Sequence, residues 1–145
     1  MEQKINITNI AYIAGLFDGE VSVDYKQRLE TRGKKKYKVW RIIMDIAMTD
    51  ESVVKWVHEV LGVGSIMERP PRKPHYKKQW RLRCSFREAL YVAKLIWPYT
   101  QVKLHAIENI IDHYEPRIQD LNDNVVNLEE ERISRIARNP WNNLL

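Results

Sequence analysis

Two acidic residues, Asp18 and Glu20, end the first apolar segment of the chain, and their types suit the binding of a cation. The apolar residues before them recur with helical spacing. Both carboxylates are therefore expected at a helix C-terminus, where the helix dipole repels anions by about 0.3–1 kcal/mol each. Hard cations such as Mg²⁺ take oxygen ligands from carboxylates and from substrate phosphates. The pattern indicates a cation held between these acids and a phosphate backbone; the alternative is an amphipathic helix that ends in two solvated acids.

Lys103 is a second candidate for chemistry because it lies near the start of a helix expected over residues 101–114, where the dipole disfavours a cation. Beside a scissile phosphate, its ammonium group would stabilise the negative charge of the transition state or help to polarise the attacking water. The alternative is an ordinary surface lysine. The sequence has no Gly-rich phosphate loop and no Ser/His/Asp or Cys/His arrangement, so nucleotide hydrolysis and covalent catalysis have no support.

The basic residues are concentrated in two windows, residues 21–41 and 65–87, although the whole chain has a net charge of only +5. Together the windows hold sixteen of the 24 Lys and Arg residues and three of the 19 acids, which gives them +13 and leaves −8 for the remainder. This segregation predicts one positive surface that binds a polyanion, with nucleic acid the leading candidate. Two solvated hairpins without a partner are the alternative, and a protein-interaction module would not need such segregation.

The elements that must position these residues follow from hydrophobic periodicity, caps and breakers. They predict an α+β fold with one four-stranded antiparallel sheet, covered on one face by helices and open on the other. The expected helices cover residues 8–18 (capped by Thr8), from Thr49 or Asp50 to Gly62, from Ser85 to before Pro98, 101–114 and about 128–138; the expected strands cover 21–29, 36–48, 65–69 and 79–85.

The alternation of side chains along each strand predicts which residues face the open side. Trp80, Leu82 and Cys84 are apolar and are expected to pack against the helices, so the residues between them face outward. The predicted open-face residues are Ser22, Asp24, Lys26, Arg28, Arg41, Ile43, Asp45, Met67, Arg69, Gln79, Arg81 and Arg83, and the predicted phosphate-contacting loop residues are Lys34, Lys36, Lys38, Arg72, Lys73, Lys77 and Lys78.

Three short segments in the right order resemble one protein family. Residues 13–20 (IAGLFDGE) resemble the motif of the LAGLIDADG homing endonucleases, and LGVGSI (61–66) and WPYTQVK (97–103) extend the likeness from about Tyr12 to Tyr114. A single copy of the motif in 145 residues resembles the homodimeric branch of that family. The last glycine of the motif is replaced by Val21.

The resemblance implies roles for individual residues. Glu20 corresponds to the acid that binds divalent metal, with the carbonyl of Gly19 completing the coordination. Asp18 corresponds to the first motif acid, which acts at the catalytic centre and mainly bonds to the partner helix. Ala14 and Gly15 correspond to the close-packed helix–helix positions at the dimer axis. Lys103 corresponds to the basic catalytic residue beside the site.

The resemblance also implies an activity. The chain would be a homodimeric, site-specific DNA endonuclease that uses Mg²⁺ to hydrolyse phosphodiester bonds in a long, roughly palindromic site and leaves short 3′ overhangs; Mn²⁺ or Ca²⁺ would also fit the site. The alternative is a non-catalytic nucleic-acid binder of the same fold, such as an intron RNA maturase or a DNA-binding regulator.

Length and composition predict one domain over residues 1–145, with a core at about 8–114 and a helical C-terminal extension at about 115–145. The single Cys84 excludes a disulfide within the chain and a zinc site built on paired cysteines. No apolar run approaches the roughly 18 residues of a membrane span, and the first residues lack a signal-peptide pattern. We therefore expect an intracellular protein, cytoplasmic or organellar, without a membrane partner.

Overall fold

The computed structural model of the chain describes residues 5–115, and its elements follow the predicted order through the helix at 104–114. The elements are α1 (Ile7–Glu20), β1 (Ser22–Arg32), β2 (Lys35–Met48), α2 (Glu51–Leu61), β3 (Ser65–Arg69), β4 (Gln79–Ser85), α3 (Arg87–Ile96), the 3-10 helix η1 (Trp97–Tyr99) and α4 (Leu104–Tyr114). The predicted α+β fold is confirmed. The predicted helix at about 128–138 and the rest of the extension lie outside the described residues.

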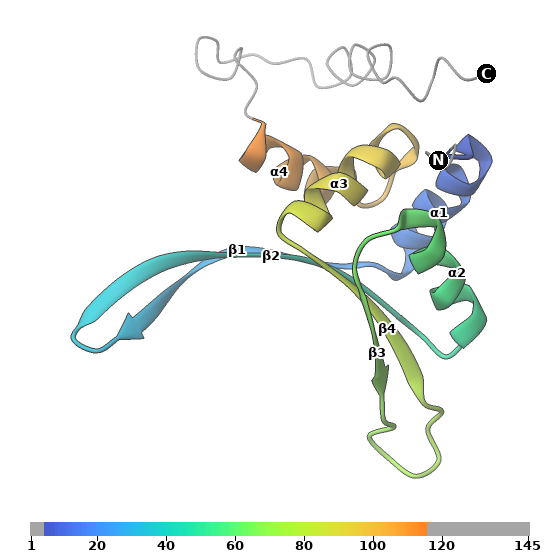
Figure 1. The fold of residues 1–145 in the computed structure, drawn as a ribbon, viewed down its shortest axis with the longest axis horizontal. Coiled ribbons are helices and arrows are strands. Elements are labelled where there is room, and N and C mark those ends of the chain that lie inside the picture. The colour runs from blue at the N-terminus through green and yellow to red at the C-terminus, as the bar shows by residue number, and fades with distance from the viewer. Residues whose placement is uncertain (1–4, 116–145) are drawn as a thin grey trace.

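The four strands form one antiparallel sheet in the order β1-β2-β4-β3. The helices lie together on one side of this sheet, and the two hairpins diverge from them like the two sides of a saddle (Figure 1). The β1–β2 hairpin continues well beyond the helices as a long curved arm. The predicted arrangement of one covered face and one open face is therefore confirmed.

The core lies between the sheet and the helices, as strand alternation predicts. Ile42, Met44 and Ile46 of β2 and Leu82 and Cys84 of β4 are each at most 1% exposed. They belong to one cluster with apolar residues of all four α-helices, and Trp80 packs against this cluster while partly buried. Side chains at odd positions of β4, including Arg81 and Arg83, consequently lie on the open face.

Helix α1 begins one residue earlier and ends two residues later than the sequence predicted. Asn6, not Thr8, is its N-cap, and the Asn6 side chain accepts a hydrogen bond of 2.8 Å from the backbone amide of Thr8. After the helix, the Val21 amide donates to the Phe17 carbonyl at 2.9 Å, and the Val21 side chain is 4% exposed in the core. The extended backbone of Val21 leads into β1 without a glycine at this position.

The β1–β2 hairpin is longer than predicted because its turn has only two residues, Gly33 and Lys34. Arg32 pairs directly with Lys35, and Gly33 has a φ of +64°, which favours glycine. Lys36 and Lys38 lie in β2, as the strand predicted over 36–48 implies, and not in a loop as the predicted phosphate contacts assumed. None of the helices among residues 5–115 is long and apolar enough to cross a membrane.

Candidate functional site

Asp18 joins two elements that are distant in the sequence. Its carboxylate accepts hydrogen bonds from the backbone amides of Gln101, at 2.9 Å, and Lys103, at 3.1 Å. Lys103 is the N-cap of α4, so this acid satisfies free amides at the positive end of a helix. The unfavourable position of Asp18 at the C-terminus of α1 is thereby compensated within the chain. The bond to a partner helix that the resemblance implies stays a prediction, and within its own chain the carboxylate already accepts two hydrogen bonds.

Glu20 has no such partner. It is the last residue of α1, it is exposed, and within residues 5–115 its side chain makes no hydrogen bond or ion pair. Gly19 is also exposed in this last turn, where helix carbonyls lack intrahelical donors. No group of three or more His, Cys, Asp or Glu residues within the described region could hold a metal ion. One chain therefore offers a single free carboxylate beside a helix end.

Lys103 lies at the same end of α1, because its backbone is bound to Asp18. Its side chain is partly buried and makes no ion pair within residues 5–115. Helix α4 begins at Leu104 rather than at residue 101, so the segment before it is a turn. Val102, in this turn, is 78% exposed.

The outward face of α1 differs from the prediction at one position. Ala14 is 0% exposed and belongs to the chain's own core, because it lies on the same side of the helix as Ile13 and Phe17. Its implied place in a dimer interface is therefore corrected. Gly15, about 100° further around the helix, is exposed, and an added Cβ would meet nothing within 4 Å. Gly19 is equally open, one turn along the same face.

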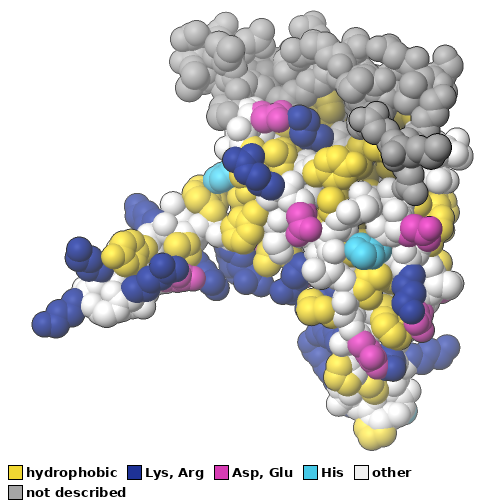
Figure 2. Space-filling view, viewed as in Figure 1, with side chains coloured by type: hydrophobic (Ala, Val, Ile, Leu, Met, Phe, Trp, Pro, Cys, Tyr) yellow, Lys and Arg dark blue, Asp and Glu magenta, His cyan; other side chains and the backbone are white. Residues whose placement is uncertain are grey.

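The predicted open-face residues do share one face of the sheet. Cross-strand partners include Lys26 with Arg41, Asp45 with Arg83, and Met67 with Arg81. Lys and Arg side chains follow the β1–β2 arm and gather in the hollow between the two hairpins (Figure 2). That these residues contact DNA stays a prediction, whereas their common orientation is confirmed.

Two lysines lie on the other face. Lys36 and Lys38 pair with Thr31 and Leu29, so they share the parity of Trp40 instead of that of Arg41. The prediction of loop lysines is wrong for both residues, because the short turn places them within β2. The same register places three further residues on the open face, namely Arg32, Lys35 and Tyr37. The sequence alone did not reveal their orientation.

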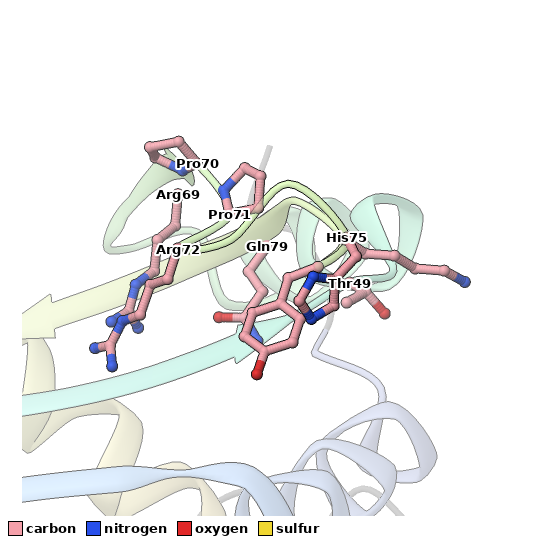
Figure 3. A pocket seen from close by; sticks show the side chains of 9 residues that line it. Thr49, Arg69, Pro70, Pro71, Arg72, His75 and Gln79 are labelled. Carbon is pink, nitrogen blue, oxygen red and sulfur yellow. The ribbon is translucent and has the colours of Figure 1, made fainter.

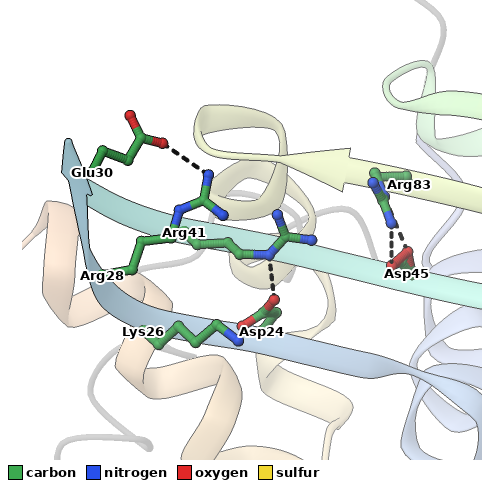
Figure 4. A network of polar contacts seen from close by, with 7 residues as sticks. All are labelled: Asp24, Lys26, Arg28, Glu30, Arg41, Asp45 and Arg83. Carbon is green, nitrogen blue, oxygen red and sulfur yellow. Dashed lines mark hydrogen bonds and ion pairs between the residues drawn. The ribbon is translucent and has the colours of Figure 1, made fainter. Parts of the chain in front are cut away.

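Acids on the open face are paired with arginines. Arg41 donates its Nε–H to Asp24 Oδ2 at 2.5 Å, and this hydrogen bond is the main cause of the lowered pKa of Asp24. Arg83 donates from Nε and Nη2 to the two oxygens of Asp45 at 3.4 and 3.2 Å, respectively (Figure 4). Arg81 Nε lies 3.9 Å from Asp45 and has no hydrogen-bond partner within residues 5–115 although it is buried. The sequence did not reveal these pairs because they depend on the cross-strand register.

Ile43 is an apolar residue within this charged surface. It points to the open side, yet it is only 7% exposed and does not belong to the core cluster. Its strand neighbours on that face are Arg41 and Asp45, and its cross-strand partner is Asp24. The aliphatic stem of a long charged side chain such as Arg41 covers an apolar neighbour, while its charged end stays accessible to solvent.

The loop between β3 and β4 surrounds a hollow of about 600 Å³ (Figure 3). Arg69 and Arg72 extend side by side along one end of it. Lys73 lies over the ring of Tyr76, whereas Lys78 forms an ion pair with Glu68 and lies over Trp80. The hollow is lined by Thr49, Arg69, Pro70, Pro71, Arg72, His75, Tyr76, Lys77 and Gln79.

An aromatic cluster supports the base of the β1–β2 arm on the covered face. Tyr25 and Trp40 stack with ring centroids 5.1 Å apart, and His113 of α4 contacts both rings edge-on. The Tyr25 hydroxyl lies 3.2 Å from His113 Nδ1. Burial, and secondarily the charge of Asp112, raises the pKa of Tyr25. Helix α4 therefore fixes both the Lys103 region at its start and the arm at its end.

A four-stranded antiparallel sheet with helices on one side is a fold that the chain shares with solved LAGLIDADG homing endonucleases. Among solved structures, the chain is similar to the homing endonuclease I-CvuI in complex with the I-CreI target, with a TM-score of 0.57 and 13% identity over 90% of this chain and 94% of that one. It is also similar to the archaeal intron-encoded homing endonuclease I-Vdi141I complexed with DNA, with a TM-score of 0.56 and 18% identity over 88% and 84% of the two chains.

A third similar structure is the LAGLIDADG homing endonuclease I-LtrWI bound to target DNA, with a TM-score of 0.58 and 16% identity. That match covers all of this chain and 45% of I-LtrWI. No protein-family model matches the sequence, and no curated protein matches it. The chain therefore has the LAGLIDADG homing endonuclease fold, and the resemblance seen in the sequence is confirmed for the fold.

Proposed function

We propose that the chain is one subunit of a homodimeric, site-specific DNA endonuclease that hydrolyses phosphodiester bonds with Mg²⁺. The observation that carries this proposal is the contrast between the two motif acids. Asp18 is used by the fold, since it binds the amides of Gln101 and Lys103. Glu20 has no partner among residues 5–115, is exposed, and is separated only by Val21 from the first strand of the basic face.

The open face suits duplex DNA. The major groove is about 12 Å wide and admits a two-stranded β ribbon. Strand β1 has 11 residues, which span about 37 Å at about 3.4 Å per residue, or roughly 11 base pairs at 3.4 Å per pair. I-CvuI, I-Vdi141I and I-LtrWI were each solved with DNA, which supports assigning this role to the same face here.

A second copy of the chain would complete the site. One chain has one free motif carboxylate and no cluster of three potential metal ligands in its described part. The exposed strip of α1 that includes Gly15 and Gly19 has open space above it, so another α1 can approach closely. Two-fold packing of these helices brings two Glu20 residues together and two basic sheets side by side. A roughly palindromic target then follows from the symmetry.

The donor set fits Mg²⁺. A carboxylate and a backbone carbonyl are hard oxygen ligands, and Mg²⁺ characteristically retains waters and binds substrate phosphates as well. Glu20 and the Gly19 carbonyl would hold the ion, which would supply Lewis-acid activation of water when bound. I-CvuI was solved in the presence of Mg and of Ca, which supports a divalent-cation site, and Mn²⁺ has the same ligand preference.

Lys103 would act on the phosphate. Its backbone is held by Asp18, two residues before Glu20, and its ammonium group is not used by an ion pair in the described residues. A fixed cation next to a scissile phosphate stabilises the charge that develops on the oxygens during attack. Asp18 contributes to the chemistry by holding Lys103, and in this sense it is a positioning residue.

The proposal is tested with a library of randomised DNA duplexes incubated with the purified full-length chain and Mg²⁺. We expect one palindromic consensus among the cleaved ends, short 3′ overhangs, and no cleavage with EDTA. The E20Q variant separates chemistry from binding on the same duplexes. Sequence-specific binding without cleavage in any divalent cation would contradict the endonuclease and favour a regulator, whereas selective binding of structured RNA would favour a maturase.

A further inference from the structure

The two Asp–Arg pairs of the open face differ in how the acid holds the guanidinium group, through one nitrogen of Arg41 and through two of Arg83. The way in which Arg41 is held has a consequence for base selection, provided that the open face binds duplex DNA as proposed above. Both pairs lie among the residues drawn in Figure 4. They come from different strand pairs, Asp24–Arg41 from β1 and β2 and Asp45–Arg83 from β2 and β4.

Arg41 is held through its inner nitrogen. Its Nε–H donates to Asp24 Oδ2 at 2.5 Å, and both terminal nitrogens point away from Asp24 (Figure 4). Within residues 5–115 those two nitrogens make no hydrogen bond, and the side chain is 32% exposed. Because the guanidinium group is planar and rigid, fixing Nε also fixes the direction of the terminal edge. The rotamer entropy of this edge is therefore largely lost before DNA binds.

A free terminal edge is the part of arginine that matches guanine. Two parallel N–H donors fit the O6 and N7 acceptors of guanine in the major groove, and this is the commonest specific contact of proteins with DNA. Adenine presents a donor in place of O6, so the same edge meets one unfavourable pair there. Asp24 also carries an ion pair with Lys26 at 3.7 Å, which keeps its carboxylate in place beside Arg41.

Arg83 is bound differently. Its Nε and Nη2 both donate to Asp45, so the carboxylate occupies one whole side of the guanidinium group. Asp45 also lies 3.9 Å from Arg81 Nε, and its side chain is only 18% exposed. Arg83 keeps its three other N–H donors, including the pair on its terminal edge, and the Asp45 carboxylate links it across the two central strands β2 and β4.

We propose that Arg41, oriented by Asp24, selects a guanine in each half of the DNA target. Arg41 and Asp45 are four residues apart on the same face of β2, or about 14 Å. The selected guanine therefore lies roughly four base pairs further from the centre of the target than the position opposite Asp45. Asp24 is a positioning residue for this selection.

The test is selection of bound duplexes from a randomised library, in Ca²⁺ to limit cleavage, with the wild type and the R41A, D24A, R83A and R28A variants. The wild type should enrich guanine at one symmetric pair of positions. R41A should lose that preference, by roughly 5- to 150-fold in relative affinity, and keep the others. R28A is the matched control, because Arg28 lies on the same face and is paired with Glu30. This variant should weaken DNA binding equally for all sequences.

D24A provides a readout that a merely structural defect would not give. Removing an acid from the basic face should raise the affinity for non-specific DNA, while the guanine preference falls because Arg41 is no longer held. Unfolding curves identify any variant that is not folded, and only folded variants are compared. An unchanged guanine preference in R41A, or its loss in R83A alone, overturns the inference. No enrichment by the wild type would instead refute site-specific recognition itself, and this inference with it.

Discussion

The Lys103 amide donates to the Asp18 carboxylate across 85 positions of sequence, at 3.1 Å. This bond brings the C-terminus of α1, which carries Glu20, to the segment before α4. It also explains why an acid is found at a helix C-terminus, where the dipole alone would disfavour it. The two motif acids therefore differ: Asp18 joins two elements of the fold, and Glu20 makes no hydrogen bond or ion pair within residues 5–115.

Replacing Asp18 with Ala should destabilise the chain and slow cleavage together. Loss of a capping carboxylate typically costs about 1 kcal/mol, and here the Lys103 segment would lose its orientation as well. Urea unfolding measures the loss of stability, and single-turnover assays measure the loss of cleavage rate. K103M should slow cleavage without the stability change, because the backbone amide that binds Asp18 remains. Equal stability of D18A and the wild type would contradict the capping role.

Glu20→Gln should bind DNA with nearly unchanged affinity and fail to cleave it. The substitution keeps the size of the side chain and removes the charge that Mg²⁺ requires, while the basic sheet is untouched. Gel-shift and cleavage assays on one duplex measure the two effects. E59Q is the matched control, because Glu59 is an exposed acid on α2 on the helix side, and it should cleave normally. Near wild-type cleavage by E20Q would refute the metal-binding role.

Gly15→Leu should weaken the dimer without harming the subunit. An added side chain meets nothing within 4 Å in the single chain, and leucine favours helix by about 1 kcal/mol over glycine. In a close helix–helix contact the same side chain costs about 1–3 kcal/mol, so the dimer dissociation constant should rise roughly 5- to 150-fold. Sedimentation equilibrium measures this change.

A14L is the comparison, because Ala14 is fully buried in the core. It should destabilise the subunit by overpacking, with the dimer affected only as a consequence. If the wild type is monomeric at micromolar concentration in the absence of DNA, packing through α1 is wrong.

Lys34→Ala should weaken binding to all DNA sequences alike and lower the slope of log affinity against log salt by about 1. Lys34 lies in the exposed turn of the arm, where it can reach phosphate but has no fixed direction toward a base. Fluorescence anisotropy over a series of salt concentrations gives the slope. K55A on α2 is the control and should leave it unchanged. A change in sequence preference with K34A would show that the turn reads bases.

Cys84 should not react with thiol reagents in the native protein at pH 8. Burial chiefly raises the pKa of its thiol to about 12, and the charges of Glu88 and Asp45 act in the same direction. The reactive thiolate is therefore scarce at this pH, and the Cys84 residue is only 1% exposed. Labelling with and without denaturant, read by mass spectrometry, checks this expectation; rapid labelling of the folded chain would contradict the burial of β4.

The sheet register could be predicted because one face is apolar. The alternation of Trp80, Leu82 and Cys84 with arginines allows only one orientation of β4, since a slip by one residue would bury charges. The turn at Gly33 was predicted too long, with the strands ending at residue 29 and resuming at residue 36, because the residues around it are polar at nearly every position. Alternation then carries no signal, and Lys36 and Lys38 were assigned to a loop.

The partners of the candidate site residues could not be predicted, for reasons of distance and helical phase. Nothing local links Asp18 to Gln101, and the pairing of Arg41 with Asp24 needs the cross-strand register. Ala14 and Gly15 both permit close approach, but the positions of Ile13 and Phe17 on α1 turn Ala14 inward. Composition identified the right kinds of residue, and only the packed structure separated their roles.

The support beneath the β1–β2 arm ends at the contact of Trp40 with His113. Beyond Gln27 and Trp40 most residues of both strands are exposed on either side, so local opening there breaks few buried contacts. The arm is consequently stiff at its root and compliant toward Gly33, and its amides should exchange with deuterium fastest at the tip. Tolerance of the protein for altered base pairs should follow the same gradient, rising from the middle of the DNA target toward its ends.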